Sequence, residues 1–187
     1  MIIKPFRTTS PVQLEWIQPR SFDHYFELRS GDDLLGTLCW ESILSHLATA
    51  ETAYGSWTLE QIGILNQRVE VRESSTQALV ATYFPKLMGN GVLEFEDGRV
   101  LEWEPTNFWA TNWSFFDESD SPSMTLREGV KGGGWRDMFK TQFTLTVEQQ
   151  EAWTPARLAL LAALGLYLII LRQQAAAGAV AATAAVM

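Results

Sequence analysis

The sequence contains little thiol or imidazole chemistry. It has one cysteine, Cys39, and two histidines, His24 and His46, among 187 residues. A single cysteine cannot form an intramolecular disulfide, and the set excludes zinc sites built on paired Cys-x-x-Cys motifs. No motif places a nucleophile beside either histidine, so we interpret all three residues as structural. Such cysteine usage is typical of a reducing, cytoplasmic setting.

Basic residues are also scarce. The chain has 14 Lys and Arg against 22 Asp and Glu, a formal net charge of -8, and no run of basic residues. Nucleic acids and anionic membrane surfaces attract clustered positive charge, so neither is expected as the main partner. Residues 1–11 lack the apolar segment of a secretory signal, and we expect a cytoplasmic protein.

Long apolar runs are absent with one exception, residues 158–171 (LALLAALGLYLIIL). As a helix this run spans roughly 21 Å, short of the ~30 Å hydrocarbon layer of a membrane. Because it is apolar on every side, other parts of the protein must surround it. We expect a central helix over about 154–172, with Thr154 as N-cap and Pro155 in its first turn. Its expected core residues are Leu158, Leu161, Leu164, Leu168 and Leu171.

The remainder of the chain has the two-residue periodicity of about a dozen short strands. In residues 24–29, for example, His24, Phe26 and Leu28 share one face. Residues 42–53 fit a helical stripe as well as a strand, and we give strand a slight preference there. The other expected strands and hairpins occupy residues 12–17, 34–41, 56–63, 67–73, 77–84, 91–104, 107–117, 123–128 and 135–147.

The alternation of apolar and polar residues decides the register of the hairpin around Gly98, because the number of loop residues sets which faces of the two strands coincide. A two-residue loop at 97–98 would mix apolar and polar residues on each face. A three-residue loop at 96–98, with Gly98 in the left-handed conformation, instead pairs Leu93 with Leu101 and keeps the apolar residues together. We therefore predict the three-residue loop.

A closed antiparallel barrel can surround a single helix on all sides. We therefore predict a mainly β protein, with about twelve strands wrapped around one hydrophobic C-terminal helix. Length favours one domain, assigned to residues 1–172. Residues 173–187 are an alanine-rich tail that either prolongs the helix or is disordered.

This order of elements resembles the tubby C-terminal-like superfamily, which includes tubby, phospholipid scramblases and the plant LURP-one-related proteins. The resemblance rests on the strand series from residue 24 to 147, the segment 53–72 and the apolar run 158–171. In that family the helix threads the closed barrel. The resemblance implies the same fold here, and a binding or scaffold role.

Three patterns superficially resemble catalytic or binding motifs. The acidic loop at 117–120 lacks the spacing of a calcium loop, and the glycines at 132–134 lack the ending of a phosphate loop. We interpret the first as a solvated turn and the second as a flexible connection. Alternation explains four glutamates as the solvated face of a hairpin: Glu94, Glu96, Glu102 and Glu104. We therefore expect no catalytic residue, metal or cofactor.

The aromatic segment 107–117 supplies the one candidate groove. If the whole segment is a strand, Trp109 and Trp113 share a face and, with Asn107 and Thr111, line a site for a ligand or partner. The alternative is that the tryptophans fill the barrel interior against the helix.

The leading functional hypothesis is a non-enzymatic barrel that binds a protein partner or a small hydrophobic, lipid-like ligand, because no motif assembles a nucleophile, a base and an oxyanion donor. The alternative is a membrane-associated protein tethered by residues 158–187. It is not favoured, because Arg172 within that segment costs about 2.5–3.5 kcal/mol to insert. An enzyme whose site is assembled only by the fold is a third option.

Overall fold

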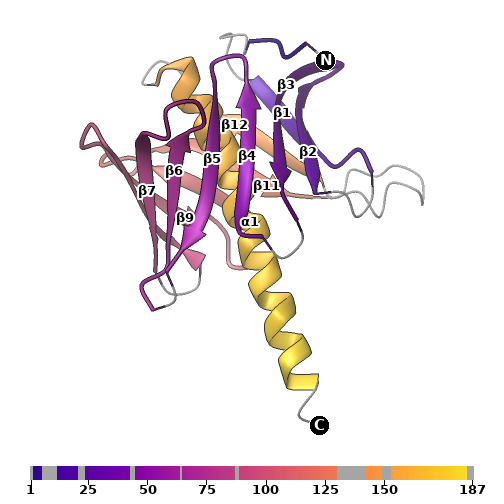
Figure 1. The fold of residues 1–187 in the computed structure, drawn as a ribbon, viewed down its shortest axis with the longest axis vertical. Coiled ribbons are helices and arrows are strands. Elements are labelled where there is room, and N and C mark those ends of the chain that lie inside the picture. Colours follow the sequence, from indigo (N-terminus) through magenta and orange to yellow (C-terminus); the bar gives the residue numbers. More distant parts are fainter. Residues whose placement is uncertain are drawn as a thin grey trace.

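The described residues of the computed structural model form twelve strands followed by one helix (Figure 1). They comprise residues 2–5, 12–20, 24–42, 45–63, 65–86, 89–129, 142–148 and 153–184. The elements are β1 (Val12–Ile17), β2 (Tyr25–Ser30), β3 (Asp33–Trp40), β4 (Leu47–Thr52), β5 (Gly55–Ile62), β6 (Arg68–Glu73), β7 (Leu79–Pro85), β8 (Gly91–Phe95), β9 (Val100–Pro105), β10 (Asn112–Phe116), β11 (Pro122–Glu128), β12 (Gln142–Val147) and α1 (Pro155–Ala184).

The strands form a closed antiparallel barrel. Each strand pairs with its neighbours in the sequence, and β1 also pairs with β12 to close the sheet. At this seam Trp16 lies opposite Leu28 on one side and Phe143 on the other. Closure satisfies the backbone groups that an edge strand would leave exposed. The predicted fold class is confirmed.

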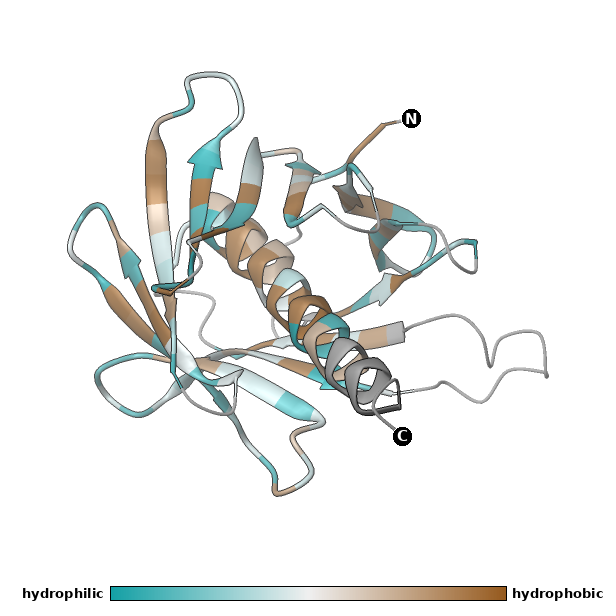
Figure 2. Ribbon diagram, turned by 60° about the horizontal axis from the view of Figure 1, so that its bottom comes forward, coloured by the Kyte–Doolittle hydropathy of each residue, from teal (hydrophilic) through white to brown (hydrophobic). Residues whose placement is uncertain are grey.

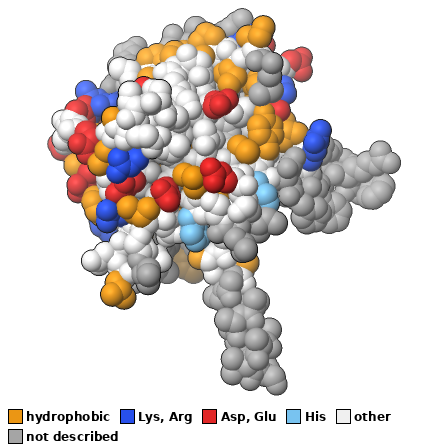
Figure 3. Space-filling model, viewed as in Figure 1, with side chains coloured by type: hydrophobic (Ala, Val, Ile, Leu, Met, Phe, Trp, Pro, Cys, Tyr) orange, Lys and Arg blue, Asp and Glu red, His pale blue; other side chains and the backbone are white. Residues whose placement is uncertain are grey.

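The outer surface of the barrel carries the polar half of each alternating strand. On β6, Val69 and Val71 are buried whereas Glu70 points outward between Arg68 and Arg72. Hydrogen bonding by the Arg72 and Arg68 guanidinium groups holds the pKa of Glu70 below its usual value, although burial opposes this effect. Acidic and basic side chains are likewise interspersed over the face of the molecule in Figure 3, so this surface is suited to water.

The helix occupies the interior of the barrel. Every residue from 158 to 170 whose side chain is large is at most 9% exposed, whichever side of the helix it lies on. Viewed from the end at which the helix emerges, the strands encircle α1 (Figure 2). Among the expected core residues, Leu171 is half-buried and packs against the edge of the core, and the others are buried: Leu158, Leu161, Leu164 and Leu168.

Local interactions fix where the helix begins. The Thr154 hydroxyl accepts a hydrogen bond from the Arg157 backbone N–H at 3.3 Å, and helical geometry starts at Pro155. This is the predicted cap. The Arg157 guanidinium also forms an ion pair with Asp97, in the β8–β9 turn. Deeper in the barrel, the Trp16 indole donates to the Ala162 carbonyl at 3.2 Å, which ties the helix to β1.

The hairpin formed by β8 and β9 has the predicted register. Leu93 lies opposite Leu101, and Gly98 has a φ of 86° in the three-residue loop. The Gly98 N–H donates to the Phe95 carbonyl, and the Phe95 N–H to the Arg99 carbonyl. Apolar side chains from both strands therefore reach the core together.

Two strand predictions need correction. In the described part of residues 42–53, which omits 43 and 44, the strand is Leu47–Thr52, β4, so the strand interpretation is right but too long. Of residues 107–117, only Asn112–Phe116 form a strand, β10, because residues 107–111 make a turn instead. The strand predicted over 135–147 is described only from residue 142. Its earlier part and the glycines at 132–134 lie outside the described residues.

Candidate functional site

The two ends of the barrel differ because α1 runs along its axis. We call the end beside Asp97 and Arg157 the entry end, because the helix begins there. We call the other end, from which α1 emerges, the exit end (Figure 1). The connections β1–β2, β3–β4, β5–β6, β7–β8 and β9–β10 all lie at the exit end, since the strands alternate in direction.

A cleft of about 470 Å³ lies at the exit end, between α1 and the inner side of β5, β6 and β7. Its size is in the range of small-molecule sites. We call it the exit cleft. Its lining residues come from strand ends and the emerging helix: His46, Gln61, Gln67, Val69, Tyr83, Pro85, Gly89, Leu168, Leu171, Arg172, Gln174 and Ala175.

Tyr167 fixes the helix at the base of this region. Its ring stacks on Trp40 with centroids 5.6 Å apart. Its hydroxyl donates to the His46 carbonyl and accepts from the Gln61 N–H at 3.0 Å. Burial raises the pKa of Tyr167, so the phenol stays protonated and can act as that donor.

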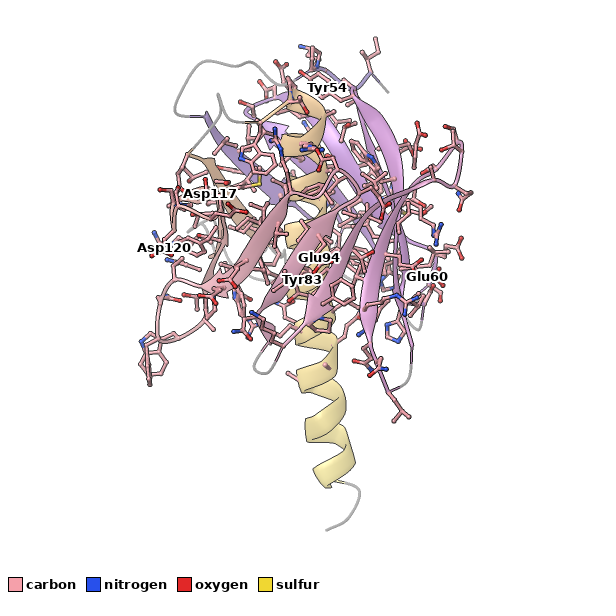
Figure 4. All side chains as sticks on the ribbon, turned by 90° about the vertical axis from the view of Figure 1, so that its left-hand side faces the viewer. Tyr54, Glu60, Tyr83, Glu94, Asp117 and Asp120 are labelled. Atoms are coloured by element: carbon pink, nitrogen blue, oxygen red, sulfur yellow. The ribbon has the colours of Figure 1, made fainter. Side chains whose placement is uncertain are left out.

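Tyr83, on β7, also lines the cleft and is labelled among the strands in Figure 4. Its hydroxyl donates to the Gly89 carbonyl at 3.1 Å, across the β7–β8 connection. Burial raises the pKa of Tyr83 well above its ordinary value. This phenol is therefore a structural donor and a poor general base.

Arg172 marks the point at which α1 leaves the barrel. Its guanidinium lies 4.9 Å from the centre of the Trp113 ring, and one nitrogen donates to the Ala110 carbonyl at 3.1 Å. Its Nε is buried and has no hydrogen-bond partner in the described structure. The adjacent Gln173 amide donates to Glu128 at 2.6 Å. Arg172 thus brings a fixed cation to the lining of the exit cleft.

The predicted groove does not form. Trp109 is 78% exposed in the turn before β10, whereas Trp113 is 1% exposed and stacks on Trp103 inside the barrel. Asn107 explains the difference: its side-chain oxygen accepts from the Thr111 and Asn112 N–H groups and closes the turn. The premise of a shared strand face is wrong, and the alternative of a core role holds for Trp113.

The other sequence patterns have structural partners. Asp117 accepts hydrogen bonds from Ser119, as expected of a solvated turn, and lies with Asp120 on the outer side of the barrel (Figure 4). Glu94 and Glu102 are exposed on the hairpin. Within the described ranges, no group of three or more His, Cys, Asp and Glu residues is placed to hold a metal ion.

Sequence reasoning missed the exit cleft. His46 had been interpreted as structural, and its carbonyl does bind Tyr167, yet the residue also lines the cleft. Tyr83 and Gln61 carry no motif that distinguishes them from other strand residues. The one available signal was Arg172, the single charge at the end of an otherwise apolar run.

No protein-family model matches the chain, and neither a curated protein nor a solved structure is significantly similar to it. One segment of α1, Pro155–Ala177, is long and apolar enough to cross a membrane, but 67% of its 18-residue window is buried inside the molecule. A core helix of a soluble protein meets the same criterion.

Proposed function

We propose that this protein is a non-enzymatic binding protein of tubby-like architecture, and that it takes a lipid-like ligand in the exit cleft. The supporting observation is the cleft itself, whose lining combines apolar side chains with the Arg172 side chain. Twelve antiparallel strands around one central helix support the tubby-like assignment.

The composition of the cleft favours an amphiphile. Val69, Pro85, Leu168, Leu171 and Ala175 supply an apolar lining that suits a hydrocarbon chain. The Arg172 guanidinium suits an anionic or strongly accepting head group, because a charged hydrogen bond is about twice as strong as a neutral one. A medium-chain carboxylate has both parts.

The same residues support a role without catalysis. Tyr83, which lines the cleft, and Tyr167, which hydrogen-bonds the lining residues His46 and Gln61, have raised pKa values and are already engaged as donors. Among the described residues that line the cleft, none is serine, threonine or cysteine, so no hydroxyl or thiol nucleophile pairs with His46.

A fluorescent dansyl-labelled fatty acid tests this function. We expect saturable binding to the full-length protein, and weaker binding of the methyl ester, which lacks the charge that Arg172 would recognise. Ala175→Trp should reduce binding severalfold, because Ala175 lines the cleft from an exposed position and the larger side chain would fill it.

Ala177→Trp is the matched control, since Ala177 is exposed on the same helix but does not line the cleft. Both variants should keep the parent melting temperature. Absence of saturable binding, or equal binding by the two variants, would contradict the proposal.

A membrane span formed by residues 155–171 is not part of the proposal. Residues 158–170 fill the barrel, and withdrawing them would expose the inward faces of all the strands. That exposure would cost far more than the ~5–15 kcal/mol stability of a typical domain.

A further inference from the structure

The largest exposed aromatic side chains lie together at the exit end. Phe108 is 92% exposed and Trp109 is 78% exposed, both in the β9–β10 turn. Their rings pack edge to face with centroids 5.3 Å apart, so they form one apolar tip. The same turn contacts Arg172 through the Ala110 carbonyl, which places the tip beside the emerging helix.

Two more apolar side chains lie at this end. Leu65, in the β5–β6 connection, is 95% exposed, and Phe84, near the end of β7, is 41% exposed. Single exposed hydrophobic residues are ordinary on a protein surface. Their concentration around one end of a barrel, from three separate connections, is not explained by packing within the chain.

The emerging part of α1 is uncharged. Residues 173–184 follow Arg172 with two glutamines and then small, mostly apolar residues. They continue the helix by about 18 Å along the barrel axis and project beyond the strands (Figure 1). The rim side chains and this helix segment, residues 65, 84, 108, 109 and 173–184, are together called the exit rim.

The entry end has the opposite character. Among the described residues, its turns and strand ends carry more acidic than basic side chains. The basic ones are Lys4, Arg29, Arg72, Arg99 and Arg157. The acidic ones include Asp32, Asp33, Glu96, Asp97, Asp117, Glu118, Asp120 and Glu148. Connections at the exit end instead mix Arg20, Lys86 and Arg172 with Glu41 and Glu128. An anionic surface would therefore repel the entry end and leave the exit end free to approach.

We propose that the exit rim docks on the interfacial layer of a lipid bilayer, with the barrel axis near the membrane normal and the acidic entry end directed away. This inference goes beyond the proposed function and does not require a ligand in the exit cleft. The core segment of α1, residues 158–170, stays inside the barrel throughout.

The shape of the rim favours lipid over a protein partner. Protein interfaces need packed, complementary surfaces. The exit rim is instead a set of separate projections around a protruding helix. A fluid bilayer can close around each projection, and Trp and Phe are residues favoured at its interface.

Flotation with vesicles tests the proposal. Full-length protein is mixed with phosphatidylcholine vesicles, and the bound fraction is measured across lipid concentrations. We expect the double variant Phe108→Ser, Trp109→Ser to weaken vesicle binding at least about tenfold. The free energy gained when one large apolar side chain leaves water corresponds to a change in affinity of about that size.

Ile2→Ser is the matched control. Ile2 is 85% exposed, but it precedes Lys4, whose N–H donates to Leu34 at the entry end. This variant should bind vesicles like the parent. Brominated lipids should also quench parent fluorescence more than that of Trp109→Phe, because Trp109 would lie within the interface.

Several outcomes would overturn the proposal. Failure of the full-length protein to float with vesicles is one, and equal loss in Ile2→Ser is another. Self-association that requires the aromatic tip without vesicle binding would identify the rim as an interface between copies. Fatty-acid binding is scored separately: Ala175→Trp should impair it while vesicle binding persists, so the two proposals can fail independently.

Discussion

At the scale of single residues, Gly165 lies where α1 packs closely against β10 and β11. A Cβ atom at this position would lie 2.7 Å from one methyl carbon of Leu126 and 3.4 Å from the Phe115 ring. Leu126 and Phe115 are both fully buried, so neither has free space into which to move. A glycine here therefore serves packing, although glycine costs a helix about 1 kcal/mol relative to alanine.

We expect Gly165→Val to destabilise the protein. The helix backbone would gain a few tenths of a kcal/mol, but overpacking against Leu126 should cost about 1–3 kcal/mol, so the net effect is a loss. Urea denaturation followed by far-UV circular dichroism measures it. Ala175→Val, at an exposed position of the same helix, is the control and should change stability by less than about 0.5 kcal/mol. Equal effects would contradict the close packing.

The ion pair between Asp97 and Arg157 should make stability depend on pH. The hydrogen bond from Arg157 is the largest cause holding the pKa of Asp97 below its usual value. A carboxylate with a depressed folded-state pKa stabilises the fold above its unfolded pKa of ~3.9 and loses that effect as pH falls through the folded value. Asp97→Asn should therefore lower the melting temperature at neutral pH, and the difference should vanish in acid.

Thermal melts from neutral to acidic pH check this, with Arg157→Gln as the partner variant. The double variant should be about as stable as either single variant, because both changes remove the same contact. A difference between parent and Asp97→Asn that persists in strong acid would show that another interaction of Asp97 is responsible.

Residues 107–113 show where sequence reasoning fails at this scale. Trp109 and Trp113 have the spacing of one strand face, yet one is exposed and the other buried. The local signal was Asn107, whose side chain hydrogen-bonds the backbone and offers it a turn in place of a strand. Alternation alone cannot reveal such a competition, so the proposed groove was misplaced.

At the scale of elements, the hairpins and α1 were predictable because each has a strong local pattern. Parity fixed the β8–β9 register, and an apolar run with a threonine cap and a following proline fixed the helix start. The sequence pattern did not indicate where α1 ends. An alanine-rich segment favours helix wherever it lies, so the sequence left both outcomes open for residues 173–187, and the helix continues to Ala184.

The core and exit portions of α1 should respond differently to truncation of leucine. Leu164 is fully buried, so Leu164→Ala should cost about 2–5 kcal/mol through lost burial and a cavity. Leu171 is half-buried beside the exit cleft, and Leu171→Ala should cost less than about 1.5 kcal/mol. The two losses are compared from the urea concentrations at the unfolding midpoints, with the slope of unfolding free energy against urea held the same for both variants. A larger loss for Leu171 would contradict the observed helix depth.

At the scale of the whole molecule, closure and core form one cooperative unit. The seam between β1 and β12 requires both ends of the strand series, and α1 contributes side chains to the same hydrophobic core as the strands. The exit cleft arises only at this scale, because its lining residues come from three strands (β5, β6 and β7), from connections between strands and from the helix. That is why no single stretch of sequence indicated it.

A chain ending before Thr154 should therefore fail to fold. Without α1 the interior of the barrel would be empty, and the truncated protein should lack the cooperative unfolding transition of the full chain. Circular dichroism and solubility, measured beside the full-length protein, check this. A truncated protein that is soluble and melts cooperatively would show that the barrel does not depend on its helix.

The position of the core helix after all twelve strands also has a consequence for biosynthesis. Ribosomes add about 5–20 residues per second, so β12 leaves the ribosome roughly 2–7 seconds before the end of α1, and the earlier strands leave sooner still. During that interval the inward-facing apolar side chains of the strands have no helix to pack against. The barrel therefore cannot complete its core until α1 has left the ribosome, and until then the nascent chain exposes hydrophobic strands that chaperones bind.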